Sequence, residues 1–241
     1  VKYSILLFLL ILISGLLLWW PAKRVEWKNK LQFNWKGSTR WRRKNYDLHT
    51  VVGAYIYALA FAFAFTGSVM SFPWFYYLAF KATGGDSEPR FVIPDHAVPV
   101  HSTAITAMDK LIPQLRAEAG DAVSFELHYP ATDTASIYVE ISWQEGVYFN
   151  SDYRFFNQYT LEEIETPSIY GKYRNADFAD KVIRWNYDIH VGAIGGLAGK
   201  IIAFLASLIV ASLPLTGFMI WYGRQKKSRN KGQKRTAARD G

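Results

Sequence analysis

The chain has 241 residues, of which 17% are aromatic and 20% are charged, and its formal net charge is +8. So many charges exclude a simple bundle of membrane helices and indicate a membrane protein that also carries a water-exposed domain. The absence of cysteine excludes disulfides, thiolate nucleophiles, iron–sulfur clusters and cysteine-ligated zinc.

Three segments are long and apolar enough to span a bilayer. Residues 3–20 carry no charge, and the basic residues follow them, so we interpret this segment as a membrane helix rather than a signal peptide. Residues 51–77 are uncharged and end in an aromatic group typical of a membrane interface. Residues 193–222 hold one charge, Lys200, near their start, and Pro214 predicts a kink.

The distribution of charge predicts the topology. Residues 21–47 carry nine Lys or Arg against two acids, and the tail from residue 224 carries eight more basic residues. Residues 73–190 instead hold 9 basic and 17 acidic residues. The positive-inside rule therefore places the first loop and the tail in the cytoplasm and residues 73–190 on the far side. We interpret the positive net charge as this topology signal and expect no nucleic-acid binding, since no basic, aromatic-interleaved fold accompanies it.

The far-side segment reads as one small α+β domain. Residues 103–119 have a helical period of apolar side chains, imperfect at Pro113. Alternating strand-like runs follow at 122–129, 136–143 and 146–149, and residues 155–161 could add another strand. The flanks at 84–98 and 167–180 have the composition of surface linkers.

A short motif occurs twice. Residues 45–49, Asn-Tyr-Asp-Leu-His, recur as residues 186–190, Asn-Tyr-Asp-Ile-His, and each copy opens an apolar run. Both runs then carry Thr-Gly, at 66–67 and 216–217. Such a repeat indicates that one structural unit is used twice. Placing an ionisable residue at the end of a membrane helix costs free energy, so the two motif histidines predict a cofactor or ion site.

The repeat also predicts an earlier copy. Residues 14–19 resemble residues 216–221, and basic residues follow both. Projecting the first histidine back by the same offset places a further copy before residue 1. We therefore expect an N-terminally truncated sequence, from a protein with four spans and two related far-side domains. The alternative is that these short matches are sequences that occur commonly in membrane helices.

The order of these features resembles the PepSY-associated transmembrane proteins, often described as iron-regulated inner-membrane proteins. The resemblance rests on the two histidine motifs, their Thr-Gly partners and the glycine-rich segment 192–199. It covers nearly the whole chain, but the first third of the family's pattern is absent from this sequence. It implies a membrane α-helical bundle, with three spans here and four in the complete protein, in the bacterial inner membrane, with an inserted periplasmic α+β PepSY-like domain. The expected order is helix 1–20, basic cytoplasmic loop 21–47, helix 48–77, periplasmic domain with linkers 78–183, helix 184–223 and basic cytoplasmic tail 224–241.

Members of this family include haem-containing ferric-siderophore reductases, so the resemblance implies b-type haem. A neutral imidazole is the usual axial ligand of haem iron, which makes His49 and His190 the candidate ligands; interfacial snorkelling is the competing interpretation. Because the two lie at opposite faces, roughly 30 Å apart, they cannot share one iron. Two haems are expected, each with a second ligand from the missing part or another subunit. Asp47 and Asp188 are expected to cap helices rather than orient the imidazoles.

Further residues are candidates for contact with the cofactor. Gly53, Gly192 and Gly196 could give a porphyrin backbone clearance, although helix packing requires the same clearance. Arg184 could pair with a haem propionate.

The predicted function is a b-haem electron-transfer protein. It would accept electrons from a cytoplasmic or membrane donor and reduce a ferric siderophore or other Fe(III) chelate in the periplasm. Trp185, Tyr187 and the aromatic residues 74–77 could line the chelate site, with an aromatic belt as the competing explanation. The alternative function is a non-enzymatic PepSY membrane protein that regulates or binds a periplasmic protease or transport partner.

Overall fold

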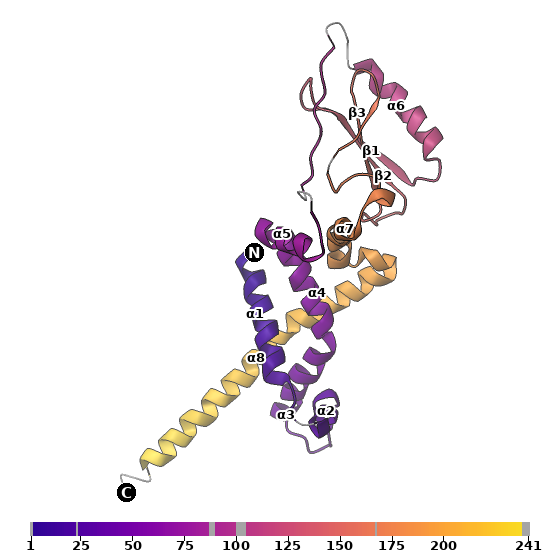
Figure 1. Cartoon of the computed structure of the whole chain (residues 1–241). Coiled ribbons are helices and arrows are strands. Elements are labelled where there is room, and N and C mark those ends of the chain that lie inside the picture. The colour runs from indigo at the N-terminus through magenta and orange to yellow at the C-terminus, as the bar shows by residue number, and fades with distance from the viewer. Residues whose placement is uncertain (1, 23, 87–89, 100–104, 167, 238–241) are drawn as a thin grey trace. The chain divides into compact units, whose positions relative to one another are not determined.

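The computed structural model describes the whole chain except residues 1, 23, 87–89, 100–104, 167 and 238–241. The chain divides into two compact units, Val1–Phe65 with Ile201–Gly241, and Thr66–Lys200. The elements in chain order are shown in Figure 1. Before the sheet these are α1 (Lys2–Trp19), α2 (Arg24–Leu31), α3 (Trp41–Asp47), a π-helical turn η1 (Leu48–Val52), α4 (Gly53–Ser71), α5 (Pro73–Ala82) and α6 (Ile105–Glu118). After it come η2 (Tyr173–Asn175), α7 (Phe178–Val191), η3 (Ala193–Gly195) and α8 (Gly196–Ala237).

Within the described part of the chain, three stretches of helix are apolar and long enough to cross a membrane: Lys2–Trp19, Trp41–Ser71 and Ala193–Lys226. The three predicted spans are therefore confirmed. None of the residues of α1 is buried within the protein, as expected for a helix whose surface is left to lipid.

The second span ends earlier than predicted because of a proline. Phe72 has an extended backbone (φ −126°, ψ 115°), which is the conformation favoured before Pro73. Pro73 then opens a separate helix, α5, at a position where its missing N–H costs nothing. The predicted helix 48–77 is thus wrong at both ends, since helical structure already begins at Trp41 and the aromatic group belongs to α5.

The predicted continuous helix 184–223 is also wrong. α7 ends at Val191, and Gly192 follows with φ 77°, the left-handed conformation in which glycine is favoured at a helix end. A short 3-10 turn leads to Gly196 (φ 59°), where α8 begins. α8 then continues through Pro214 and past residue 223 to Ala237.

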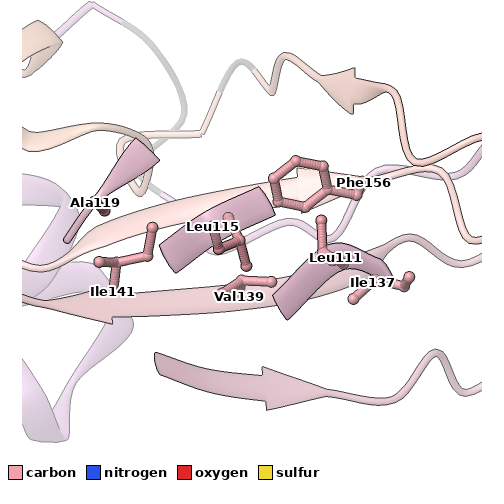
Figure 2. Close-up of a cluster of buried hydrophobic side chains, with 7 residues drawn as sticks. All are labelled: Leu111, Leu115, Ala119, Ile137, Val139, Ile141 and Phe156. Carbon is pink, nitrogen blue, oxygen red and sulfur yellow. The ribbon is translucent and has the colours of Figure 1, made fainter. Parts of the chain in front are cut away.

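The segment between the second and third spans forms the predicted α+β fold. Four antiparallel strands lie in the order β1 (Ser124–His128), β2 (Ile137–Ser142), β3 (Asp152–Phe156) and β4 (Glu163–Ile164). α6 covers one face of the sheet (Figure 1), within the predicted range 103–119, of which residues 103 and 104 lie outside the described residues. The core between helix and sheet consists of Leu111, Leu115, Ala119, Ile137, Val139, Ile141 and Phe156 (Figure 2).

The other face of the sheet carries aromatic rings. Tyr138 stacks on Phe155 and Tyr153, with ring centroids 5.5 and 5.9 Å apart, and Phe91 packs edge-on against Tyr138 at 5.1 Å. Phe91 belongs to the segment predicted as a surface linker. This segment is attached to the sheet, since Asp95 also forms a β-bridge with Ala135.

The expected strand at 146–149 is wrong, because these residues form a loop between β2 and β3. An alternation of apolar and polar residues over only four positions does not distinguish a strand from a loop. Here a side-chain carboxylate, that of Asp188, accepts hydrogen bonds from the N–H groups of Tyr148 and Phe149 in the loop.

Candidate functional site: two histidine–threonine clamps

The first clamp lies in the unit that contains α3 and most of α8. His49 Nδ1 is 2.9 Å from the Thr216 hydroxyl oxygen. Asn45 Nδ2 donates to the carbonyl oxygen of the same threonine at 3.0 Å. Asparagine and histidine are four residues apart, so they lie on one helical face and contact Thr216 together. His49 sits in the π-helical turn, a local distortion that is frequent at functional sites.

The glycine after Thr216 makes room for the imidazole. A Cβ on Gly217 would lie 3.3 Å from His49 Cε1, tighter than ordinary van der Waals contact. The histidine ring therefore rests against the backbone of α8. The two residues of the Thr-Gly pair therefore have different roles: Thr216 forms the hydrogen bond to the imidazole, and Gly217 leaves space for the imidazole ring.

The second clamp lies in the other unit and has the same design. His190 Nδ1 is 2.9 Å from the Thr66 hydroxyl oxygen, and Asn186 Nδ2 donates to the Thr66 carbonyl oxygen at 3.1 Å. Each histidine motif thus holds the Thr-Gly of the other copy of the repeat. All four segments can be recognised in the sequence, but their pairing cannot, because each contact joins segments that are far apart in the chain.

The motif aspartates face away from the clamps. In a helix, a residue two positions on lies about 200° around the axis. Asp47 Oδ2 accepts hydrogen bonds from Trp35 Nε1 at 3.1 Å and Arg43 Nε at 3.0 Å. No side-chain cap hydrogen bond accompanies Asp47, so its predicted capping role is wrong.

Asp188 holds the loop after β2. Its Oδ2 accepts from the backbone N–H groups of Tyr148 and Phe149 at 2.8 and 2.7 Å, and the residue is 0% exposed. The predicted capping role of Asp188 is wrong, because α7 begins at Phe178 and is capped by Asp177.

Arg184 lies one turn before Asp188 and holds the same loop. Its Nε donates to Phe149 O at 3.1 Å, and its other guanidinium nitrogens donate to the carbonyls of Gly171 and Ser151. Burial lowers the pKa of this guanidinium. Three backbone carbonyls already accept from this buried guanidinium, so these contacts favour a structural role, and the propionate pairing stays a prediction.

The candidate glycines differ in their surroundings. An added Cβ at Gly53 or Gly196 would meet nothing within 4 Å. Gly192 and Gly196 have positive φ values, and a Cβ on Gly199 would lie 2.2 Å from the Gly192 carbonyl oxygen. The turn between α7 and α8 therefore accounts for Gly192 and Gly196 without a cofactor. Porphyrin contact at Gly53, Gly192 and Gly196 stays a prediction.

The other described histidines belong to the sheet domain. His96 Nε2 contacts Ala135 O at 3.1 Å, and the His128 ring stacks on Tyr138 with centroids 4.4 Å apart. His101 lies outside the described residues. Among the residues that the structure describes, no group of three or more His, Asp or Glu side chains could hold a metal ion. A haem needs no such group, since it brings four nitrogen ligands of its own.

The donor set of the clamps fits an axial haem ligand. A metal-ligating histidine usually binds the metal through one ring nitrogen and forms a hydrogen bond through the other. In both clamps Nδ1 is hydrogen-bonded to a threonine hydroxyl, and at His49 this arrangement points to Nε2 as the nitrogen for iron. Both histidines are half-buried.

These features define an integral membrane protein with three apolar helices, an α+β domain and two equivalent histidine sites built from an internal repeat. The chain belongs to the family of the PepSY-associated TM region, whose family model matches residues 1–224. The expected family and fold class are thereby confirmed. A search of curated proteins found no match.

Proposed function

We propose that this protein is a b-haem electron carrier of the bacterial inner membrane that reduces ferric siderophores or other Fe(III) chelates in the periplasm. The observation that carries the proposal is the pair of identical clamps, each with an imidazole whose Nδ1 is held by a threonine. When bound, a haem at each histidine supplies one-electron exchange between Fe(III) and Fe(II). The surplus of basic residues in 21–47 and after 224 supports the cytoplasmic side for the donor.

The residues of the chain hold the ligands in place. Asn45 and Thr216 form the first clamp and Asn186 and Thr66 the second, so each imidazole is fixed by a neighbouring helix rather than by its own. An electron delivered by a cytoplasmic or membrane donor would leave on the periplasmic side. There it converts a chelated Fe(III) to Fe(II).

Exposed aromatic residues near the second clamp support a docking place for the chelate. Tyr187 and Tyr148 are 46% and 48% exposed, and their rings pack edge to face with centroids 5.5 Å apart. Asp188 holds Tyr148 in position through its backbone N–H. Trp185 is instead tied by its Nε1 to the Tyr173 hydroxyl at 3.0 Å.

Absorbance spectroscopy on the detergent-purified protein tests the haem. We expect a b-type Soret band that shifts on reduction by dithionite and is reoxidised by an added ferric siderophore. The double variant His49→Ala/His190→Ala should lack the band, whereas His128→Phe, which keeps the ring stacked on Tyr138, should retain it. A protein that stays without the band after hemin is supplied, or a double variant that keeps it, contradicts the proposal.

The alternative function, a non-enzymatic module that binds a periplasmic protease or transport partner, has one observation in its favour. A hollow of about 450 Å³ lies between α6 and β1, with Ile112, Val123 and Phe125 in its lining. β1 is an edge strand of the four-stranded sheet, and such an edge can add an extended peptide. The double histidine variant discriminates between the functions, because it should leave partner binding at this edge intact.

A further inference from the structure

We propose that Thr66 and Thr216 are positioning residues that fix the protonation of the facing imidazoles and so present Nε2 to iron. The role toward iron rests on the proposed function. The assignment of the imidazole proton does not, because it follows from the hydrogen bonds of the protein alone.

The hydroxyl of Thr216 can donate only one hydrogen bond. It donates to the Leu213 carbonyl oxygen at 2.9 Å, the neighbour three residues earlier that helical threonines commonly bond. The oxygen is then an acceptor in its contact with His49 Nδ1 at 2.9 Å. The donor in this contact is therefore Nδ1–H of the imidazole.

A neutral imidazole carries a single N–H, so a proton on Nδ1 of His49 leaves a lone pair on Nε2. Iron requires that lone pair. In the opposite tautomer the lone pair would be on Nδ1, which lies 2.9 Å from the Thr216 hydroxyl oxygen, and Nε2 would carry the proton. Thr216 thus selects the tautomer that can act as a ligand.

For the second clamp we infer the same assignment from its matching geometry alone. Thr66 faces His190 at the same 2.9 Å, and Asn186 anchors the Thr66 carbonyl as Asn45 anchors that of Thr216. Each asparagine donates a hydrogen bond to the backbone carbonyl of the threonine. The position of the threonine hydroxyl is therefore fixed through its backbone as well as through its contact with histidine. This arrangement explains why a hydroxyl residue precedes glycine in both copies.

Nitrogen-15 NMR of the full chain labelled on histidine, in detergent and without haem, tests the tautomers. We expect His49 and His190 of the wild type to show protonated Nδ1 and unprotonated Nε2, with His49→Gln and His190→Gln variants assigning the signals. Thr216→Val should remove this preference at His49 alone, and Thr216→Ser should restore it. A wild-type spectrum with protonated Nε2 overturns the proposal, and this arm needs no variant to fold.

Hemin titration supplies the second readout. Thr216→Val and Thr66→Val should each weaken haem binding at one site by about 10- to 100-fold, the usual cost of losing a hydrogen bond to a ligating histidine. Each serine variant should return to the wild-type affinity and to the wild-type electron paramagnetic resonance signal of the ferric haem. Valine variants with unchanged affinity and signal overturn the positioning role. If the wild type binds no haem but shows the expected tautomers, the proposed function fails while the proton assignment stands.

Discussion

His49 and Thr216 are 167 residues apart in the chain, yet Nδ1 of one lies 2.9 Å from the hydroxyl oxygen of the other. His190 and Thr66, which are 124 residues apart, have the same contact at the same distance. Each histidine therefore takes its partner from the other copy of the repeat. A chance resemblance between two membrane helices does not predict such an exchange of partners, so the repeat is structural.

Gly217→Ala should weaken the first clamp alone. The added methyl would lie 3.3 Å from His49 Cε1, so the ring must shift, at a cost of about 1–3 kcal/mol for overpacking. Haem titration should show weaker binding at the site of His49 and unchanged binding at the site of His190. Gly223→Ala is the matched control on the same helix, because a Cβ there meets nothing within 4 Å. Equal losses in both variants would show that the effect is not a matter of space at the imidazole.

Asp188→Ala should loosen the loop after β2. The buried carboxylate accepts two backbone hydrogen bonds, and their loss leaves the N–H groups of Tyr148 and Phe149 without this partner. We expect the free energy of local opening at these two amides to fall by about 1–3 kcal/mol, measured by hydrogen exchange. The exposed Asp86→Ala serves as control. Unchanged exchange at both amides would contradict the role of Asp188.

The stability of the sheet domain should decrease in acid. Hydrogen bonds from Arg154 lower the pKa of Glu118. At Glu163, burial raises the pKa, but hydrogen bonds from Arg154 and Lys172 outweigh it, and the net shift is also downward. Both carboxylates bind protons less readily when folded than when unfolded. Their stabilisation is therefore complete above the ordinary pKa of 4.5 and is lost as the pH falls through the lower folded values.

Thermal unfolding of the purified protein, from neutral pH downward through 4.5, measures this dependence. Arg154 donates to Glu118 at 2.7 Å and to Glu163 at 2.6 Å, so Arg154→Met should flatten the acid slope and lower stability at neutral pH. A variant whose slope equals that of the wild type would rule out this ion-pair cluster as the cause.

Leu115→Ala should destabilise the sheet domain by about 2–5 kcal/mol. Leu115 is 0% exposed and lies between α6 and the central strands (Figure 2), so the truncation leaves a cavity. Hydrogen exchange of the β2 amides measures the loss. Ile112→Ala, at a position on the same helix that is 37% exposed, should change the opening free energy by about 0.5 kcal/mol or less.

Local periodicity predicted much of the fold from the sequence. The three spans, α6, β1 and β2 follow from apolar runs and from alternation within a few residues. The run predicted at 155–161 is wrong for most of its length, since it overlaps β3 only at residues 155 and 156. The ends of the spans were wrong where a single residue decides the backbone. Pro73 separates α5 from α4, and the positive φ of Gly192 and Gly196 separates α7 from α8.

The site was predicted only in part. The repeat identified His49 and His190, but the clamps depend on contacts between segments that are far apart in the chain, and no local pattern encodes them. Asp47 and Asp188 were interpreted as caps because aspartate near a helix start usually caps it. Because a helix has 3.6 residues per turn, each aspartate lies on the helix face opposite the asparagine and histidine of its motif. This spacing was a signal in the sequence that the aspartates contact other parts of the protein.

The number of haems per chain, measured by the pyridine haemochromogen assay, tests whether both histidines bind haem iron. We expect His49→Ala and His190→Ala each to remove one haem from the number found in the wild type, and the double variant to bind none at these positions. Equal haem content in the wild type and all three variants would contradict this expectation.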